Sequence, residues 1–316
     1  MEFDLIARIR DRCTHRRGDV ALGIGDDAAL LDVPTGQQLV ACTDTLVAGV
    51  HFPAATAPED IGWKSLAANL SDLAAMGAEP AWALLALTLP DADARFVERF
   101  ADGFATLADR HAVALIGGDT TQGPLSITVT ALGIIPRGMA LTRGGASAGD
   151  SVFVTGAVGD AAGALKLLLD GRPTPAPLLA RLHRPEPRAK AGIALRGVAS
   201  ACIDISDGLL ADLGHVCAAS GVGAEIDADV LPLSSSLRAA FDDAACRELA
   251  LAGGDDYELC FTLPCEREGR VAPALVAAEC GATRIGRIVA GSGVSVVDAR
   301  GNGIETPRAG WEHFAP

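Results

Sequence analysis

Basic residues, long apolar runs and aromatic side chains are all scarce in this sequence of 316 residues. Lysine and arginine together number 26 against 40 aspartates and glutamates, which gives a formal net charge of -14 at pH 7. That sign argues against a general nucleic-acid or anionic-membrane surface, although a cation could still mediate binding of a phosphorylated small molecule. No apolar run of about 18 residues is free of charge, glycine or proline, and the opening MEFDLIARIRDR has no apolar signal segment. We therefore expect a soluble cytoplasmic protein.

Several familiar site signatures are also missing. The eight cysteines form no CxxC pair and the six histidines form no HExxH motif, which argues against a zinc site or a disulfide framework. We expect the cysteines to be small buried apolar residues. The phosphate-binding motif GxxxxGKS/T and the protein-kinase signatures are absent too, so any nucleotide chemistry requires a different fold.

The composition that remains is typical of a globular chain. Apolar residues make up 49 % of the sequence and charged residues 21 %. Aromatics are only 4 %, so we expect cores built from small aliphatic side chains. The length suffices for two domains of ordinary size. We predict a boundary in the glycine-rich RGGASAGD (143–150), with domains at 1–146 and 147–316.

Five segments have the composition of β-strands. QLVACTD (38–44) is an extended apolar run that ends in an acid, and HAVALIGGDT (111–120) repeats that plan with a tight glycine turn before Asp119. The other three are rich in apolar or β-branched residues and cover 124–135, 150–156 and 258–264.

Helical segments alternate with these strands. Leu66, Leu70 and Leu73 recur at helical spacing within 59–80, and a glycine and a proline then signal the end of that helix. The mixture indicates an α/β or α+β fold. The remaining predicted segments are helices at 93–111 and 159–171 and a proline-rich loop at 172–177.

Aspartates recur at predicted strand ends and in tight turns. Alone, each is most often a helix cap or a turn residue. The first two are Asp26 and Asp27 in LGIGDDAALL. The stretch GIGDDA around them formally matches the GxGxxG/A fingerprint of dinucleotide sites, but the two carboxylates would repel a pyrophosphate. The others are Asp44 in CTDT, Asp119 in GGDT, and Asp204 and Asp207 in IDISDG.

Asp72 differs because it lies on a predicted helix, where it shares a face with Ser65, Asn69 and Met76. Taken together, the acids indicate a cluster that binds hard divalent cations, and oxygen ligands favour Mg²⁺ over zinc. Bound Mg²⁺ would attract the phosphates that the carboxylates alone repel. Arg143 in ALTRGG could clamp a phosphate or could be a surface charge.

Seven motifs occur in order along the chain: LGIGDDAAL, CTDTLVAGVHF, NLSDLAAMGAEP, LIGGDTT, ALTRGGASAGD, IDISDGLLADLGH and GGDDYELCF. In this order they resemble the motifs of the thiamine-monophosphate kinases, a family within the superfamily of aminoimidazole ribonucleotide synthetase. The resemblance runs through essentially the whole chain.

The resemblance implies a two-domain α/β (α+β) fold of the aminoimidazole ribonucleotide synthetase type. The N-terminal domain would bind ATP and Mg²⁺ and pair with its copy in a homodimer with a barrel-like sheet, and the C-terminal domain would close over the site. The implied reaction transfers the γ-phosphoryl group of ATP to thiamine monophosphate, the last step of thiamine diphosphate biosynthesis, with several Mg²⁺ ions. We expect direct in-line transfer without a phosphoenzyme.

Individual roles follow from the same resemblance. His51, Asp255 and Trp311 would bind thiamine monophosphate, Trp311 through attraction between its ring and the cationic thiazolium. The implied ATP contacts are Gly118, Asp119, Arg143 and Ser206. The implied catalytic residues are Arg143, Asp44 and Asp119. The implied metal ligands are Asp27, Cys42, Thr43, Asp44, Asp72, Asp119, Asp204 and Asp207.

Two positions depart from the family pattern. Cys42 stands where a serine is common, and because a hydroxyl suits Mg²⁺ better than a thiol, Cys42 could ligate through its backbone carbonyl instead of its side chain. GGDD replaces the usual GGED, so Asp255 has a carboxylate one methylene shorter than the usual glutamate. Asp256 or Glu258 could take its role.

Other functions stay open on the sequence alone. One is a different ATP-dependent enzyme of the same superfamily, an aminoimidazole ribonucleotide or selenophosphate synthetase. Another is a non-catalytic Mg²⁺-nucleotide-binding protein. A metal phosphatase is disfavoured, because the acids lack a histidine-rich dinuclear pattern.

Overall fold

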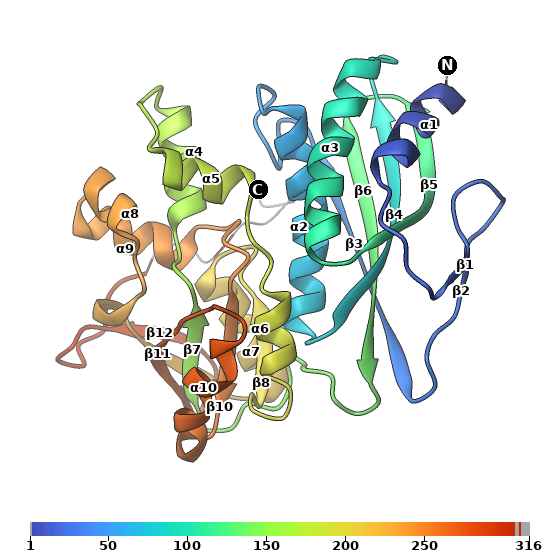
Figure 1. Ribbon diagram of the computed structural model, residues 1–316. Helices are drawn as coiled ribbons and strands as arrows, with labels where there is room; N and C mark the ends of the chain where they lie inside the picture. The colour runs from blue at the N-terminus through green and yellow to red at the C-terminus, as the bar shows by residue number, and fades with distance from the viewer. Residues whose placement is uncertain (1, 307–309, 311–316) are drawn as a thin grey trace. The chain divides into compact units, whose positions relative to one another are not determined.

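The computed structural model describes residues 2–306 and 310, and the chain divides into two compact units (Figure 1). The N-terminal unit contains Met1–Leu73 and Ala78–Gly138. The C-terminal unit contains Ala74–Gly77 and Met139–Pro316. No helix in the described part of the chain combines the length and apolar character that a membrane crossing requires.

The N-terminal unit is built on a four-stranded sheet with the strand order β3-β6-β4-β5. β4 is antiparallel to β6 and parallel to β5, and β3 is antiparallel to β6. The strands are β3 (Gln37–Val47), β4 (Glu79–Leu89), β5 (Ala114–Gln122) and β6 (Ser126–Pro136). The helices are α1 (Glu2–Arg12), α2 (Pro58–Ala75) and α3 (Ala94–Arg110).

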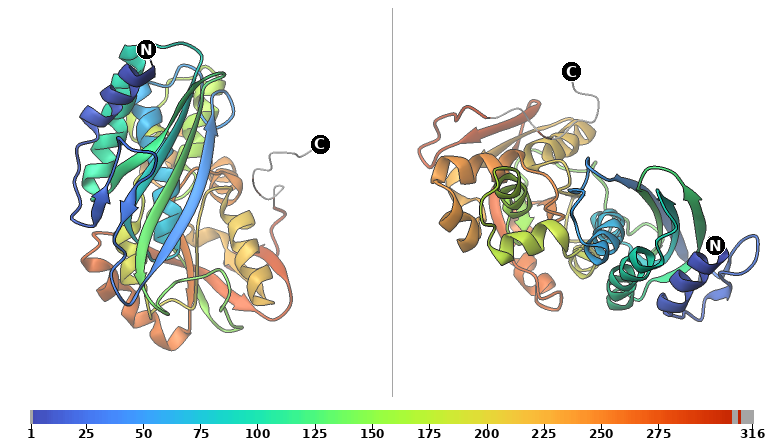
Figure 2. Two further views of the ribbon diagram at one scale, coloured as in Figure 1. Left: turned by 90° about the vertical axis from the view of Figure 1, so that its right-hand side faces the viewer. Right: turned by 90° about the horizontal axis from the view of Figure 1, so that it is seen from above.

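Helices α2 and α3 lie together against one face of this sheet (Figure 2). Glycines permit their close approach: a Cβ at Gly62 would lie 2.0 Å from the carbonyl oxygen of Phe100, and a Cβ at Gly103 would lie 1.8 Å from that of Glu59. Asp93 caps α3 by accepting hydrogen bonds from two backbone N–H groups.

Alternation along β3 decides which side chains face these helices. Cys42, Asp44 and Leu46 are at least partly buried, whereas Thr43 and Thr45 are exposed, as the two-residue period of a strand requires. The second set belongs to the opposite face of the sheet, which we call the open face.

A short hairpin covers one end of the open face. It consists of β1 (Val20–Leu22) and β2 (Leu30–Leu31), and the acidic sequence GIGDD lies in the loop between the two strands. Val20 and Leu31 pack against a cluster that includes Trp82, and the indole of Trp82 donates a hydrogen bond to Asp19 at 3.1 Å.

The C-terminal unit contains a six-stranded mixed sheet with the strand order β12-β9-β11-β7-β10-β8. Its strands are β7 (Ser151–Thr155), β8 (Ala201–Asp204), β9 (Gly223–Asp227), β10 (Leu259–Leu263), β11 (Ala282–Val289) and β12 (Gly293–Val297). Its α-helices are α4 (Asp160–Leu169), α5 (Ala176–His183), α6 (Ala189–Ala194), α7 (Leu209–Ser220), α8 (Ser235–Ala240), α9 (Asp243–Ala252) and α10 (Val271–Val276). Two 3₁₀ turns, η1 (Ala228–Val230) and η2 (Cys265–Arg270), complete it.

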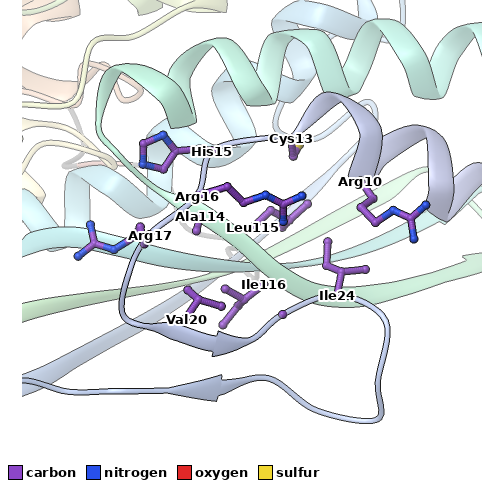
Figure 3. Close-up of a pocket in the computed structure, with 11 residues that line it drawn as sticks. Arg10, Cys13, His15, Arg16, Arg17, Val20, Ile24, Ala114, Leu115 and Ile116 are labelled. Carbon is purple, nitrogen blue, oxygen red and sulfur yellow. The ribbon is translucent and has the colours of Figure 1, made fainter.

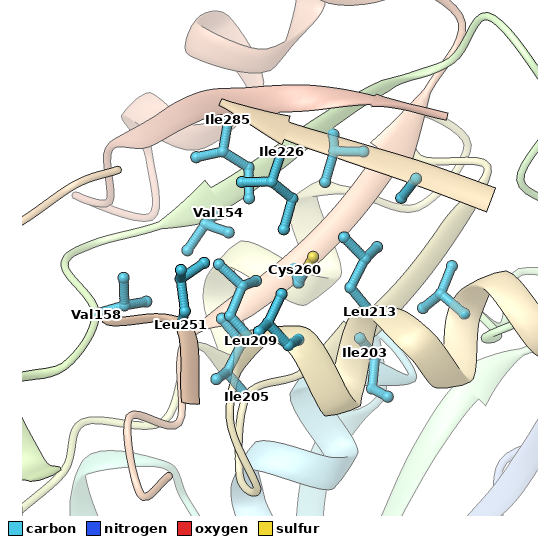
Figure 4. Packing of buried hydrophobic residues seen from close by; sticks show 14 of the residues in the cluster. Val154, Val158, Ile203, Ile205, Leu209, Leu213, Ile226, Leu251, Cys260 and Ile285 are labelled. Carbon is cyan, nitrogen blue, oxygen red and sulfur yellow. The ribbon is translucent and has the colours of Figure 1, made fainter. Parts of the chain in front are cut away.

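Apolar side chains cover both faces of this sheet. On one face, Leu209 and Leu213 of α7 pack against Ile203 and Cys260 of the strands (Figure 4). On the other, the rings of Phe153 and Phe261 stack with centroids 5.5 Å apart, in a cluster that includes residues of α6 and α10. This two-sided cover explains why β7, β8 and β10 are buried throughout.

Most predicted elements are confirmed. The strands expected at 38–44, 124–135, 150–156 and 258–264 are β3, β6, β7 and β10, and the helices expected at 59–80, 93–111 and 159–171 are α2, α3 and α4. The proline-rich 172–177 connects α4 to α5, which already begins at Ala176. All eight cysteines are free. The expectation that they are buried is wrong for Cys265, which is exposed.

Two expectations about the N-terminal sheet are wrong. Gly117 and Gly118 form no tight turn, because β5 continues through them to Gln122. Asp44 and Asp119 consequently lie inside β3 and β5, not at strand ends. The strand β4 was not predicted, since its nearly continuous apolar sequence follows Pro80 without the alternation that marks a strand.

Gly118 is required for the approach of β5 to β4. Its φ is +154°, and a Cβ there would lie 1.8 Å from the carbonyl oxygen of Leu85. We expect Gly118→Ala to lower the free energy of unfolding by about 3 kcal/mol, because the backbone of β4 would have to shift. Urea unfolding followed by circular dichroism measures this.

Gly117→Ala is the matched control for that measurement. Its added methyl would meet only the side chain of Leu84, at 3.0 Å, and that side chain can rotate away. Equal unfolding midpoints for Gly118→Ala and the unsubstituted chain would contradict the close-approach argument.

Candidate active site

Two predicted metal-binding aspartates of the N-terminal unit come from neighbouring elements. Asp44 is on β3 and Asp72 is on α2. The same two elements are connected by a hydrogen bond, which the thiol of Cys42 on β3 donates to the carbonyl oxygen of Asn69 on α2 at 3.3 Å. The pKa of the Cys42 thiol lies above its ordinary value, chiefly because of burial and further because of the negative charges of Asp72 and Asp44. Cys42 therefore stays protonated between the two carboxylates.

The acidic loop between β1 and β2 is exposed. Within it, the carboxylate of Asp26 accepts a hydrogen bond from the backbone N–H of Asp27 at 2.9 Å. This bond gives Asp26 a local role in the turn. The side chain of Asp27 is exposed and available to a ligand.

Asp119 is remote from Asp44 within the N-terminal sheet. β3 and β5 are the two edges of the sheet, with β6 and β4 between them. Three strand spacings separate the edges, a distance of about 14 Å. Asp44 of β3 pairs with Val129 of β6, which pairs with Leu85 of β4, which in turn pairs with Gly118 of β5. Paired residues point to the same face of a sheet and successive residues to opposite faces, so Asp119 points to the opposite face from Asp44. One sheet does not place both carboxylates on one ion.

His51 follows β3 and is held by the backbone. Its Nδ1 accepts a hydrogen bond from the N–H of Val47 at 3.0 Å, so Nε2 carries the ring proton of the neutral imidazole. The buried ammonium of Lys64 donates to the carbonyl oxygen of His51 at 3.1 Å. His51 thus presents an N–H donor from a fixed backbone position.

In the C-terminal unit, three predicted site residues lie on one loop. Asp204 ends β8, and Ser206 and Asp207 lie in the turn before α7. The carboxylate of Asp212 accepts hydrogen bonds from the backbone N–H groups of Ser206, Asp207 and Gly208, each at 3.1 Å. Burial raises the pKa of Asp212 to about 8, with further contributions from the charges of Asp204 and Asp207.

The segment 253–258, with the sequence GGDDYE, runs beside that loop. The backbone N–H of Asp255 donates to the carbonyl oxygen of Ser206 and that of Tyr257 donates to the carbonyl oxygen of Ile205, both at 2.8 Å. Asp255 and Tyr257 have φ values of +68° and +51°, in the left-handed region. The Tyr257 hydroxyl donates to the Asp255 carboxylate at 3.1 Å. This conformation is strained, as is common at ligand sites.

Neither proposed substitute for Asp255 is free to bind a substrate. Glu258 is fully buried and accepts hydrogen bonds from Arg181 at 2.7 Å and from Nε and Nη2 of Arg188 at 2.7 and 2.5 Å. Asp256 is 1 % exposed, and both of its carboxylate oxygens accept the N–H of Gly159. Burial raises the pKa of Asp256 well above its ordinary value. These two acids are structural, and Asp255 keeps the predicted role.

The remaining predicted residues are placed as follows. Arg143 is exposed in the C-terminal unit, and its carbonyl oxygen accepts a hydrogen bond from Ser220 at 3.2 Å. Thr43 lies on the open face, where the Thr130 hydroxyl donates to its oxygen at 3.1 Å. Trp311 lies outside the described residues.

Sequence reasoning missed the residues that hold this site together. Asp212 follows the turn in IDISDGLLAD, but nothing local distinguishes it from an ordinary helix residue. Arg181 and Arg188 lie 77 and 70 residues from Glu258, so only the tertiary structure pairs them. Asn69 was noted on the face of Asp72, which was the one available sign of its contact with Cys42.

The donor chemistry fits Mg²⁺, although the described residues contain no ready-made group of three metal-binding His, Cys, Asp or Glu side chains. Asp44 and Asp72 flank a protonated thiol, and Asp204, Asp207 and Asp212 repel one another around a single loop. Sites for Mg²⁺ commonly supply one or two carboxylates and leave the remaining positions to water and phosphate. Both acidic groups match that pattern.

A separate basic cavity of about 130 Å³ lies beside the first residues of β5 (Figure 3). Arg10, Arg16 and Arg17 line it together with the apolar side chains of Leu115 and Ile116. The guanidinium of Arg17 forms an ion pair with the carboxylate of Asp19 at 2.8 Å. The cavity contains none of the residues predicted for the site.

Family models match both units of the chain. The N-terminal domain of AIR synthase related protein matches residues 25–135 and the C-terminal domain of the same class matches residues 147–299. With the acidic groups in both units, the fold defines a two-domain protein of the AIR synthase related class, which confirms the predicted fold.

Comparison with individual proteins narrows the class. The chain is 48 % identical to thiamine-monophosphate kinase from Salmonella typhimurium, over 99 % of this chain and 98 % of that protein. The chain belongs to the thiamine-monophosphate kinase family. Its fold matches the crystal structure of thiamine-monophosphate kinase from Stenotrophomonas maltophilia K279a with a TM-score of 0.88 and 53 % identity, covering 93 % of this chain and 96 % of that one.

A further solved structure is that of a complex. It is AaThiL complexed with AMPPCP and TMP, which matches with a TM-score of 0.79 and 37 % identity over 99 % of this chain and 97 % of that chain. These comparisons confirm the resemblance inferred from the seven motifs.

The buried ion pairs of Glu258 allow a stability test. We expect Arg188→Met to lower the free energy of unfolding by about 3–5 kcal/mol, because a buried carboxylate loses its bidentate partner. Chemical denaturation measures the loss. The double variant Arg188→Met with Glu258→Gln should lose less than the sum of the two single variants. Strict additivity would show that the pair contributes no coupling.

Proposed function

We propose that this protein transfers the γ-phosphoryl group of ATP to thiamine monophosphate, giving thiamine diphosphate and ADP in the last step of thiamine diphosphate biosynthesis. The observation that carries the proposal is the full-length similarity to AaThiL complexed with AMPPCP and TMP. AMPPCP is an ATP analogue with a methylene bridge in place of the β–γ oxygen, and we take TMP to be thiamine monophosphate. We place the reaction in the cytoplasm, where ATP is abundant.

The acids of both units are assigned to Mg²⁺. In the N-terminal unit the proposed ligands are Asp27, Cys42 through its carbonyl, Thr43, Asp44, Asp72 and Asp119. In the C-terminal unit they are Asp204 and Asp207. When bound, Mg²⁺ would neutralise phosphate charge and orient the phosphoryl groups for in-line transfer. The protonated thiol of Cys42 supports carbonyl ligation over thiolate ligation, because two carboxylates already oppose a third negative charge there.

Binding and orientation are the tasks of the other residues. Gly118, Asp119, Arg143 and Ser206 would contact ATP, with Arg143 pairing its guanidinium with phosphate oxygens. His51 would donate a hydrogen bond from Nε2 to thiamine monophosphate. Asp255 would contact the same substrate from the strained segment 253–258, which fixes its backbone conformation. The attacking phosphate oxygen of thiamine monophosphate is already anionic near pH 7, so no strong general base is required.

The separation of Asp44 and Asp119 supports a homodimer. Two carboxylates that share one Mg²⁺ need Cα atoms within roughly 10 Å, and one sheet holds these residues on opposite edges and faces. A second copy can join its β3 to this β5, since an edge strand is a template for pairing with another chain. The open face adds apolar surface for such a partner, because Leu39 is 50 % exposed and Leu84 is 36 % exposed.

The activity can be tested directly. Incubation of the protein with Mg²⁺-ATP and thiamine monophosphate should yield thiamine diphosphate and ADP in equal amounts by mass spectrometry. Omission of Mg²⁺ should abolish the product. Turnover of an aminoimidazole ribonucleotide precursor or formation of selenophosphate in place of this product would identify the other superfamily enzymes, and tight ATP binding without any product would identify a non-catalytic binding protein.

The dimer proposal predicts complementation between inactive variants. Asp44→Asn and Asp119→Asn should each abolish activity, since each removes a proposed metal ligand. A hybrid dimer purified through a different tag on each variant should regain about half of the wild-type rate, because one of its two sites takes Asp44 and Asp119 from the unsubstituted copies.

Two controls accompany the hybrid. Asp91→Asn changes an exposed turn carboxylate of the same unit and should leave the rate unchanged. An inactive hybrid dimer would place both aspartates in a single-chain site and would overturn the shared-site arrangement.

A further inference from the structure

Asp212 is a buried carboxylate that no role in the reaction has yet used. Its side chain is 3 % exposed and lies in the first turn of α7. The carboxylate reaches back toward the start of the helix, and a single oxygen, Oδ2, accepts the N–H groups of Ser206, Asp207 and Gly208. Three successive peptide planes are therefore oriented by one atom.

Within the described part of the chain, the N-cap position of α7 makes no side-chain capping hydrogen bond of its own. The N-cap position is Gly208, which has no side chain, and its φ of +122° belongs to the region that glycine favours. Space excludes a larger residue too, because a Cβ at Gly208 would lie 2.8 Å from the carbonyl oxygen of Ala252. Asp212 instead accepts the N–H of Gly208, one of the unpaired groups of this helix start, together with the N–H groups of the two residues before it.

The orientation set by Asp212 extends to a second loop, the segment 253–258. Because the N–H groups of residues 206–208 point toward Asp212, the carbonyl oxygens of Ile205 and Ser206 are left to accept the N–H groups of Tyr257 and Asp255. These two bonds connect the loop 204–208 to the segment 253–258. The strained φ values of Asp255 and Tyr257 make that segment dependent on such external bonds.

We propose that Asp212 is a positioning residue that sets the loop 204–208 and, through the backbone bonds of Ile205 and Ser206, the segment 253–258. It thereby fixes the proposed metal ligands Asp204 and Asp207 relative to Asp255, the proposed contact for thiamine monophosphate. This inference rests on the proposed function for its kinetic consequence, but the coupling of the two loops stands on the hydrogen bonds alone.

The coupling is tested by hydrogen–deuterium exchange with mass spectrometry on Asp212→Ala in the full chain. Exchange should accelerate at least tenfold in peptides covering 205–208 and also in those covering 255–257, in which the N–H groups of Asp255 and Tyr257 donate to Ser206 and Ile205. Asp212→Asn retains an acceptor oxygen and should show a smaller change in both. Unchanged exchange at 255–257 in a folded Asp212→Ala protein overturns the coupling, whatever the enzymatic activity.

Kinetics test the consequence for the site. For Asp212→Ala, the half-saturating Mg²⁺ concentration and the KM for thiamine monophosphate should both rise roughly tenfold, with Asp212→Asn between it and the wild type. If the alanine variant does not fold, Asp212→Asn alone carries both measurements. Wild-type Mg²⁺ dependence and KM in the folded variants overturn the positioning role.

A matched control separates positioning from stability. Asp242 also accepts a backbone N–H at a helix start, from Ala245 at 2.8 Å, but that start belongs to α9. Asp242→Ala should lower the melting temperature without changing KM or the Mg²⁺ dependence.

A wild-type protein that makes no thiamine diphosphate would contradict the proposed function. The exchange experiment would still decide whether Asp212 couples the loops.

Discussion

Negative charge concentrated around buried ionisable groups is the constraint on which both acidic groups of this protein depend. Burial and the charges of Asp72 and Asp44 raise the pKa of the Cys42 thiol, and burial and the charges of Asp204 and Asp207 raise the pKa of a third carboxylate, Asp212. Such groups are costly in the absence of a cation. The chain accepts this cost at two places, which is the arrangement expected where divalent ions and phosphates are to be bound.

At another buried position, that of Glu258, the fold does supply positive charges that neutralise the carboxylate. That carboxylate is fully buried between two arginines, with a threonine hydroxyl as a further donor at 2.7 Å. This pairing makes Glu258 a structural acid, whereas the aspartates of the two acidic groups are the proposed metal ligands. It also explains why Asp255, although shorter than the usual family residue, remains the substrate candidate in GGDDYE.

Sheet order places a second constraint on the site. Asp44 and Asp119 belong to the two edges of one four-stranded sheet, so a metal site that uses both depends on a second copy of the chain. The same edges would otherwise expose unpaired backbone groups. Dimer formation would therefore protect the sheet edges and complete the site in one step.

The sequence by itself determined the local elements and the family. Leucines at helical spacing predicted α2, an extended apolar run ending in an acid predicted β3, and β-branched residues predicted β6. Seven short motifs in order indicated the thiamine-monophosphate kinases. These features depend on neighbours within a few residues, where periodicity and turn chemistry act. The acidic residues of the proposed site were likewise identified from the short motifs in which they occur.

Tertiary structure alone decided the rest, because the deciding contacts are distant in the chain or depend on the backbone. The glycines before Asp119 continue a strand because β4, an apolar run without alternation, lies close beside them. Arg188 reaches Glu258 from 70 residues away. Asp212 controls its loop through backbone N–H groups, which every residue has and which no sequence pattern distinguishes. Strand order, finally, separates Asp44 from Asp119, and pairing between strands is a long-range choice that local sequence does not encode.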